Sequence, residues 1–391
     1  MKYNFDKVID RSGTSAEKLE GLKQIWGRTD LIPLWVADMD FATAPFVTDA
    51  IRKRCENEVL GYTGKPDSYY NAIINWVKLR YDLTVAKEMI NFVPGIVPGI
   101  GMAMNCFTRK GDKVMIQPPV YHPFAWITTR NERTLVTNPL KWENGMYRMD
   151  LDAFREQVKG CKLFILCNPH NPGGVVWTED ELRAIADICY DEKVLVFSDE
   201  IHADLTLPPH THRPFAAISE KARMNSVTFM SPSKAFNMPG LSASHALIFD
   251  EELRKRFRVY IDAGELDMGH VFAFLSVEAA YSHGTEWLDQ CLAYIQGNID
   301  FVDEFLKKHA PKIKAIRPEA SYLVWLDCRE LELSQKDLNE FFVDKAHLAL
   351  NDGEMFGKEG IGFMRLNVAS PRCIIEKAMK QLADAYQLYI K

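Results

Sequence analysis

The chain has 391 residues, of which 47% are hydrophobic and 26% are charged, and its formal net charge is −6. These values are typical of a globular protein in aqueous solution, and the length is sufficient for two domains. A negative net charge without a block of lysine and arginine argues against a nucleic-acid partner bound through its phosphates. The apolar runs are too short to span a membrane, so no membrane partner is expected.

Cysteine usage and the N-terminal sequence both indicate a cytoplasmic protein. The eight cysteines include no Cys-x-x-Cys pair, which favours free thiols in a reducing compartment. The first six residues, MKYNFD, lack the apolar region of a signal peptide. We therefore expect a cytoplasmic protein that folds without disulfides.

The first 45 residues are predicted to form an irregular segment, because glycines and a proline are scattered through them. A helix is predicted from about Asp67, since Tyr69, Ile73 and Trp76 would share one of its faces. The glycine-rich run 94–101 follows and should be a turn that opens a mostly apolar helix.

Short apolar runs after this turn are predicted to be buried strands that alternate with helices. They cover residues 113–117, 162–167, 194–198, 227–230 and 246–249. Between the second and the third, Thr178 and Glu181 form a capping-box pattern at the start of a helix. Fully apolar strands that alternate with helices indicate a largely parallel sheet covered on both faces.

The pattern changes near Thr285, where apolar residues at helical spacing predict one long helix through Leu306. Strands are predicted at 322–326 and 363–368, and a terminal helix follows them. The predicted architecture is therefore α/β with three parts. These are an N-terminal segment (1–45) that packs with the small domain, a large domain (46–284) and a smaller α/β C-terminal domain (285–391).

Polar loops follow four of the predicted strands, at the edge where open α/β sheets bind their ligands. They carry Tyr121, Asn171, Asp199 and Lys234, and together these residue types fit pyridoxal phosphate. Lys234 would hold the aldehyde as an imine, and Asp199 would pair with the pyridine nitrogen and keep the ring electron-withdrawing. Asn171 would donate to the phenolic oxygen, and Tyr121 would stack on the ring.

The phosphate of this cofactor would bind to hydroxyls and to backbone N–H groups at a helix N-terminus. Ser231 and Ser233 supply the hydroxyls, and Ile96 and Val97 supply the N–H groups. Taken singly, such motifs have simpler explanations; the segment 168–174, for example, could be only a turn. Their joint occurrence at strand and helix ends favours the cofactor site.

Eight segments resemble the fold-type I pyridoxal-phosphate enzymes of the class I/II aminotransferase type, and within them the MalY/PatB group of cystathionine β-lyases. They are LWVADMDF (34–41), GYT (61–63), PGIVPGI (94–100), PVYHPF (119–124), NPHNPGGVVW (168–177), SDEIHADL (198–205), SPSKAFNMPGL (231–241) and RLNVASPR (365–372). The first and the sixth separate this group from ordinary aminotransferases. The resemblance covers nearly the whole chain and implies the fold-type I architecture.

The resemblance also implies roles for residues in the site. Lys234 would be the acid–base at Cα, and Tyr62 and Tyr121 would be the other catalytic residues. His202 would stand at the phenolic oxygen, where many aminotransferases have a tyrosine. Arg365 would clamp the substrate α-carboxylate, a bidentate task that suits a guanidinium, and Asn171 would also contact the substrate.

Two further implications concern a second subunit and the substrate entrance. Tyr62 would reach the cofactor phosphate of the other subunit, which implies a homodimer with shared active sites. The entrance would be lined by Trp35, Ala37 and Asp38.

Three positions depart from the pattern of the group. Ala235 follows the lysine where threonine is common, Pro239 replaces an alanine, and Lys18-Leu19-Glu20 stands where the group has Lys-Trp/Tyr-Asp. These departures leave the cofactor residues intact, and they bear on substrate preference and on the fit of the N-terminal segment.

The predicted reaction is α,β-elimination on an amino-acid substrate such as cystathionine, which gives homocysteine, pyruvate and ammonia. Lys234 or Tyr62 would supply the proton for the leaving thiolate. One alternative is an aminotransferase, which would use the same Lys234, Asp199 and Asn171. Another is a lyase that also binds a transcription regulator, as some relatives do.

Two other kinds of site are disfavoured. The histidines 202, 210 and 212 lie in or near a proline-rich loop, which is more often solvated surface than a metal site, so no metal is expected. A dinucleotide fingerprint fails because Met104 stands where the third glycine after Gly99 and Gly101 would be.

Overall fold

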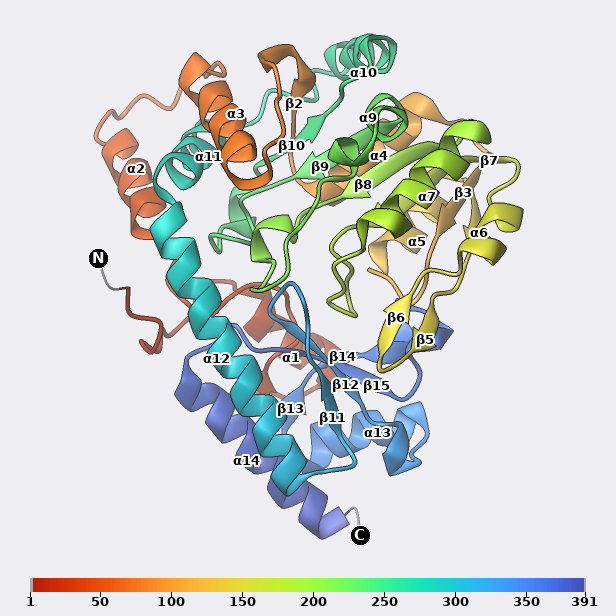
Figure 1. The fold of residues 1–391 in the computed structure, drawn as a ribbon. Helices are drawn as coiled ribbons and strands as arrows, with labels where there is room; N and C mark the ends of the chain where they lie inside the picture. The colour runs from red at the N-terminus through yellow and green to blue at the C-terminus, as the bar shows by residue number, and fades with distance from the viewer. Residues whose placement is uncertain (1–2, 390–391) are drawn as a thin grey trace.

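The protein is described by a computed structural model that covers residues 3–389. Two sheets of different size are connected by the long helix α12 (Thr285–His309), which runs alongside the C-terminal helix α14 (Arg372–Tyr389) in Figure 1. Among residues 3–389, no helix is both long enough and apolar enough to cross a membrane.

The larger sheet has seven strands in the order β2-β10-β9-β8-β7-β3-β4. The strands are β2 (Ile90–Val93), β3 (Lys113–Ile116), β4 (Thr134–Thr137), β7 (Cys161–Cys167), β8 (Leu195–Asp199), β9 (Ser226–Met230) and β10 (Ser244–Leu247). All neighbours from β4 to β9 pair in parallel, whereas β10 runs antiparallel to both β9 and β2. The predicted mostly parallel sheet is confirmed, and each of the five predicted strands occurs within a few residues of its predicted bounds.

Helices cover both faces of this sheet because successive side chains of its strands point to opposite sides. Leu163 and Ile165 pack in a cluster with helices α4, α5 and α10, while Phe164 and Leu166 pack in a second cluster with α6, α7, α8 and α9. The helices are α4 (Ile96–Phe107), α5 (Pro123–Arg130), α6 (Leu151–Gln157), α7 (Glu179–Asp191), α8 (Phe215–Ile218), α9 (Glu220–Met224) and α10 (Glu251–Ala263). Three others, α2 (Pro45–Cys55), α3 (Asp67–Tyr81) and α11 (Val271–His283), pack beyond β2 and β10 (Figure 1).

Local sequence signals explain where two of these helices begin. Thr178 and Glu181 form the predicted capping box at α7, since the Glu181 N–H donates to Thr178 Oγ1 at 3.2 Å and the Thr178 N–H to Glu181 Oε2 at 2.9 Å. Gly95 precedes α4 with a φ of +127°, which side chains rarely permit. The chain can therefore turn sharply there and expose the first N–H groups of α4.

The smaller sheet has four antiparallel strands in the order β11-β12-β15-β14. They are β11 (Lys314–Ile316), β12 (Leu323–Asp327), β15 (Phe363–Asn367) and β14 (Asn351–Asp352). Helix α13 (Gln335–Glu340) lies beside them, and two short strand pairs complete the fold: β1 (Ile32–Pro33) with β13 (Leu348–Ala349), and β5 (Lys141–Glu143) with β6 (Met146–Arg148).

The N-terminal segment is less irregular than predicted, because it contains the helix α1 (Glu17–Trp26). Gly21 suggested a break in the chain, but it lies inside this helix. The position requires a glycine because a Cβ there would come within 2.6 Å of the ring of Trp35. After β1, the segment contacts both the smaller sheet and the loop that follows β9: the Asn367 N–H of β15 donates to Leu34 O at 2.9 Å, and the Met39 N–H donates to Asn237 Oδ1 at 3.0 Å. The segment therefore passes between the two larger parts of the molecule (Figure 1).

Candidate active site

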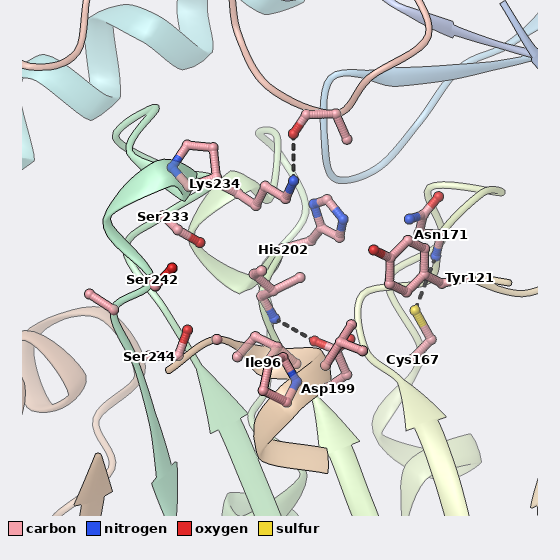
Figure 2. Close-up of a pocket in the computed structure, with 17 residues that line it drawn as sticks. Ile96, Tyr121, Cys167, Asn171, Asp199, His202, Ser233, Lys234, Ser242 and Ser244 are labelled. Atoms are coloured by element: carbon pink, nitrogen blue, oxygen red, sulfur yellow. Dashed lines mark hydrogen bonds between the residues drawn. The ribbon is translucent and has the colours of Figure 1, made fainter. Parts of the chain in front are cut away.

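A cavity of about 210 Å³ lies at the carboxyl ends of β7, β8 and β9 and at the start of α4. Its walls include nine of the predicted residues: Ala37, Ile96, Val97, Tyr121, Asn171, Asp199, His202, Ser233 and Lys234. Figure 2 shows Lys234 above the hollow, Asp199 below it, and Tyr121 with Asn171 at one side. The structure thus brings together residues that are up to about two hundred positions apart in the chain.

Lys234 presents its amine from the loop after β9. Its Nζ donates to the carbonyl oxygen of Ala37 at 2.5 Å, and no carboxylate lies within ion-pair distance of it among residues 3–389. Burial lowers the pKa of Lys234 to about 8, and the positive charge of Arg365 acts in the same direction. At pH 7, one unit below this pKa, roughly a tenth of the amine is neutral and hence nucleophilic, far more than at the ordinary lysine pKa of 10.5.

Asp199 ends β8 and is only 4% exposed. Burial raises the pKa of Asp199 to about 7, and the charge of Glu200 raises it further, while the Ile201 N–H that donates to Asp199 Oδ1 at 3.1 Å lowers it. A buried acid at the wall of a cavity is stabilised by a cationic N–H partner. The protonated nitrogen of a pyridine ring is such a partner.

His202 lies between these two groups in Figure 2 and is 4% exposed. Burial lowers the pKa of His202 to about 3, so its ring is neutral at physiological pH. Its Nδ1 atom is buried and has no hydrogen-bond partner among residues 3–389. An unsatisfied ring nitrogen beside the cavity fits a polar group of a ligand that the protein is built to hold.

Arg365 lies on β15, 3% exposed, with its guanidinium 4.8 Å from the ring of Phe356. It donates to Asn171 Oδ1 at 3.1 Å and to Asn351 Oδ1 at 2.5 Å, whereas its Nε is buried and finds no hydrogen-bond partner in the described part of the chain. None of the described residues offers it a carboxylate, and burial lowers the pKa of Arg365 to about 10. A buried cation without an anion is strained electrostatically, and a substrate carboxylate would relieve that strain.

The contact with Arg365 also orients the amide of Asn171. Because Oδ1 accepts from the guanidinium, the Nδ2 group is left free to donate into the cavity. The Asn171 N–H itself donates to Cys167 Sγ at 3.4 Å, and Cys167 lines the same wall. The amide thus has the orientation that the predicted contact with a phenolic oxygen requires.

Hydroxyl groups gather at the side of the cavity next to the N-terminus of α4. Ser233 lines it, but Ser231 lies behind, where its Oγ bonds Ser233 Oγ at 2.9 Å and Ala243 O at 2.7 Å. Ser242 and Ser244 also line the cavity (Figure 2), and neither was predicted. Together with the first N–H groups of α4, these hydroxyls form a cradle suited to a phosphate.

Three other predicted residues lie at the edge of the site or outside it. Trp35 contributes its carbonyl oxygen, which accepts from Arg365 at 3.2 Å. The carboxylate of Asp38 is turned toward Lys18 and Arg11 rather than into the cavity. Tyr62 is 99% exposed and lies in a separate surface hollow.

The histidines considered for a metal site do not converge. His212 Nε2 lies 2.8 Å from Glu200 Oε2, and His210 Nδ1 lies 3.7 Å from Glu319. Among the described residues, no group of three or more histidine, cysteine, aspartate or glutamate side chains could hold a metal ion.

Comparisons with known proteins agree with this geometry. Residues 29–382 match the family described as aminotransferase class I and II. Cystathionine beta-lyase PatB of Bacillus subtilis (strain 168) is 38% identical over 98% of this chain and 99% of its own length, and Protein MalY of Escherichia coli (strain K12) is 30% identical over 98% of both chains.

Among solved structures, the PLP-bound C–S lyase from Staphylococcus hominis superposes with a TM-score of 0.91 at 35% identity, covering 98% of each chain. This likeness extends over both sheets and the N-terminal segment, and the resemblance drawn from the sequence motifs is confirmed. The chain belongs to the class I and II aminotransferase family and, within it, to the group that contains PatB and MalY.

Proposed function

We propose that this protein is a pyridoxal-phosphate-dependent carbon–sulfur lyase that cleaves the Cβ–S bond of cystathionine or related cysteine S-conjugates. The observation that carries the proposal is a cavity lined by a lysine amine with a lowered pKa and by a buried acid, with the buried guanidinium of Arg365 directly behind Asn171 of its wall. The names of PatB, a cystathionine beta-lyase, and of the Staphylococcus hominis C–S lyase support elimination as the reaction.

The residues present fit the cofactor. Lys234 would hold it covalently, Asp199 would pair with its ring nitrogen, and the hydroxyl of Ser233 with the first N–H groups of α4 would bind its phosphate. Asn171 Nδ2 and His202 would contact the phenolic oxygen, and Tyr121 would stack against the ring. When bound, pyridoxal phosphate supplies an electron-withdrawing ring that accepts the electron pair left at Cα.

The residues of the chain then bind, orient and move protons. Arg365 fixes the substrate α-carboxylate, and Lys234 Nζ, left free once the substrate amine has taken its place, removes the proton from Cα. The Cβ–S bond breaks, and the sulfur leaves with the bonding electrons and takes a proton from Lys234. After hydrolysis, the carbon skeleton leaves as pyruvate and the nitrogen as ammonia. Thiolates are good leaving groups, so a correctly placed amine is sufficient for this step.

A homodimer and a cytoplasmic location complete the proposal. Large apolar side chains gather around Tyr62, where Val59 is 72% and Leu60 is 60% exposed beside the hollow that Met268 lines. Such a patch fits a second copy of the chain, which would bring Tyr62 to the partner's cofactor phosphate. All eight cysteines are free thiols, which suits a reducing compartment.

The proposal is tested by incubating the purified, pyridoxal-phosphate-loaded protein with cystathionine in the absence of any keto acid. Release of pyruvate together with a free thiol is the expected result, and Lys234→Ala is the control that should release neither. Turnover that occurs only after a keto acid is added would show an aminotransferase instead. Cystine and cysteine, assayed in the same way, would rank the natural substrates.

A further inference from the structure

Residues 35–38 form a strip that touches both the catalytic amine and the carboxylate clamp. The Ala37 carbonyl accepts from Lys234 Nζ at 2.5 Å, and the Trp35 carbonyl accepts from Arg365 at 3.2 Å. A shift of this strip would therefore move the acceptors of both groups together.

The strip is an irregular segment, so its conformation depends on side chains that bind its carbonyl groups. Asn367 Nδ2 donates to the Val36 and Asp38 carbonyls at 2.7 Å each, and the Tyr322 hydroxyl donates to the Ala37 carbonyl at 2.9 Å. These contacts hold the side of the strip that faces the smaller sheet.

Helix α1 also holds the strip, through Lys18. This lysine is 1% exposed, and its Nζ lies 3.0 Å from Asp38 Oδ1, 3.0 Å from Asp40 Oδ1 and 3.2 Å from the Asp38 carbonyl. In addition, Trp35 Nε1 donates to the Lys18 carbonyl at 3.1 Å. One residue of α1 therefore contacts the strip at both of its ends.

A second cation and a hydroxyl complete the network. Arg11 lies 2.6 Å from Asp38 Oδ2 and 3.0 Å from Asp40 Oδ1, and Ser370 Oγ donates to Asp40 Oδ2 at 2.6 Å. Arg11 is 25% exposed, whereas Lys18 is enclosed, so water can replace the Arg11 guanidinium only in part and the Lys18 amine not at all. Without the Lys18 amine, two neighbouring carboxylates would face a vacated, unhydrated position and repel each other.

We propose that Lys18 is a positioning residue for this active site: its buried amine draws Asp38 and Asp40 together and thereby fixes the Ala37 and Trp35 carbonyls against Lys234 and Arg365. Lys18 touches neither substrate nor cofactor, and it acts through residues 35–38. The inference deepens the proposed lyase function, but its geometry concerns the amine of Lys234 whichever reaction follows.

The test compares Lys18→Met, which keeps most of the length of the side chain without its charge, with Lys18→Arg, which keeps the charge. Lys23→Met is the matched control, since Lys23 is an exposed lysine of the same helix. The first readout needs no turnover: cofactor-free protein is mixed with pyridoxal phosphate, and the rise of the visible absorption band reports the rate at which Lys234 captures the aldehyde. The second readout is kcat and KM for cystathionine.

Lys18→Met is expected to slow capture and to lower kcat/KM by about 10- to 100-fold, since displacements near 1 Å can cost that much. Lys18→Arg should recover most of both, and Lys23→Met should match the wild type. Wild-type capture and kcat/KM in a folded Lys18→Met protein would overturn the proposal, as would equal losses in the Met and Arg variants. The two proposals can fail separately. If neither the wild type nor any variant releases pyruvate, the proposed lyase function is wrong. The positioning role still holds in that case if capture is slow in Lys18→Met and close to the wild-type rate in Lys18→Arg and Lys23→Met.

If Lys18→Met does not fold, Arg11→Met tests the same network from its partly exposed side. Capture slowed about 2- to 5-fold, with an unchanged thermal midpoint, would support the proposal. Unchanged capture in that variant would overturn it, because Lys18 would then serve folding alone.

Discussion

Asp199 is the residue whose protonation most directly links the site to stability. The folded-state pKa of about 7 lies above the ordinary value of 3.8, so the cofactor-free fold is favoured below pH 4 and loses stability as the pH rises from 4 to 7. Asp199→Asn should therefore stabilise the cofactor-free protein by up to about 4 kcal/mol at pH 8 and by little at pH 4. Urea unfolding at the two pH values measures this.

The same substitution should weaken the binding of pyridoxal phosphate, because a neutral amide cannot form an ion pair with a protonated ring nitrogen. Asp384→Asn, at an exposed position of α14, is the control for a general effect of removing a carboxylate. An equal stability difference at pH 4 and pH 8 would contradict the assignment of the raised pKa to Asp199.

Arg365 offers a second prediction at this scale. Arg365→Lys keeps the positive charge but loses the planar donors that contact Asn171 and Asn351, and a lysine cannot bind a carboxylate with two parallel bonds. The KM for cystathionine should rise, and kcat/KM should fall about 10- to 100-fold, the equivalent of one charge-assisted hydrogen bond. Steady-state kinetics measure the change, and an unaltered KM would show that the carboxylate binds elsewhere.

Individual site residues were predictable where they follow an apolar run. Asp199 is the last residue of a parallel strand, and Asn171 and Lys234 follow parallel strands, whose carboxyl ends lie at the ligand edge of the sheet. Ser242 and Ser244 were missed because one lies just before β10 and the other begins it, and β10 runs antiparallel to β9. The start of such a strand lies at the same edge, but nothing in the local sequence reveals the direction of a strand.

At the scale of elements, the N-terminus of α4 depends on the backbone of Gly95. Gly95→Ala would force a Cβ into a φ of +127° and to 3.3 Å from Pro98, so we expect a loss of about 1–3 kcal/mol of stability. The affinity for pyridoxal phosphate should also fall, because the first N–H groups of α4 would shift. Equilibrium dialysis and chemical unfolding measure the two effects.

Gly111→Ala is the matched control for this prediction. Gly111 also has a positive φ, +84°, but an added Cβ would meet no atom within 4 Å, and the residue is absent from the cavity wall. Gly111→Ala should therefore introduce backbone strain comparable to that of Gly95→Ala, but it should leave the affinity for pyridoxal phosphate unchanged. A Gly95→Ala protein with unchanged affinity would show that α4 does not bind the phosphate.

Long elements with strong periodicity were predictable, whereas short or glycine-containing ones were not. Apolar residues at helical spacing revealed α12, and a capping box marked the start of α7. Helix α1 was not predicted because a glycine such as Gly21 usually disfavours a helix. The reason for a glycine at this position is the contact with Trp35, which lies fourteen positions later in the sequence. Tertiary contact overrides local propensity at such a position.

At the scale of the whole molecule, the two-sheet architecture followed from strand–helix alternation and the change of pattern near Thr285. The three-part division at residues 45 and 285 stays a prediction, as does the second subunit. The spacing of hydrophobic residues indicates which face of a helix or strand is buried within the chain. It does not indicate whether a second subunit covers a surface that is exposed in the single chain. The exposed tyrosine at position 62 is where this matters most, since its predicted role lies in another subunit.

Mixing two inactive variants tests that role. Tyr62→Phe removes the hydroxyl proposed to reach the partner's cofactor phosphate, and Lys234→Ala removes the amine. In a mixed dimer, one site would receive Lys234 from the first chain and Tyr62 from the second, and so would be complete. With random exchange between equal amounts, half of the dimers are mixed and one site in each is intact, so about a quarter of wild-type activity should return.

The outcome depends on which subunit supplies Tyr62. If the tyrosine served its own chain, every site in the mixture would lack one of the two groups, and no activity would return on mixing. Each variant alone is the control, and light scattering before mixing establishes that both are dimers. Full activity of Tyr62→Phe alone would remove the hydroxyl from the mechanism, whereas recovery on mixing would show that each active site is built from two chains.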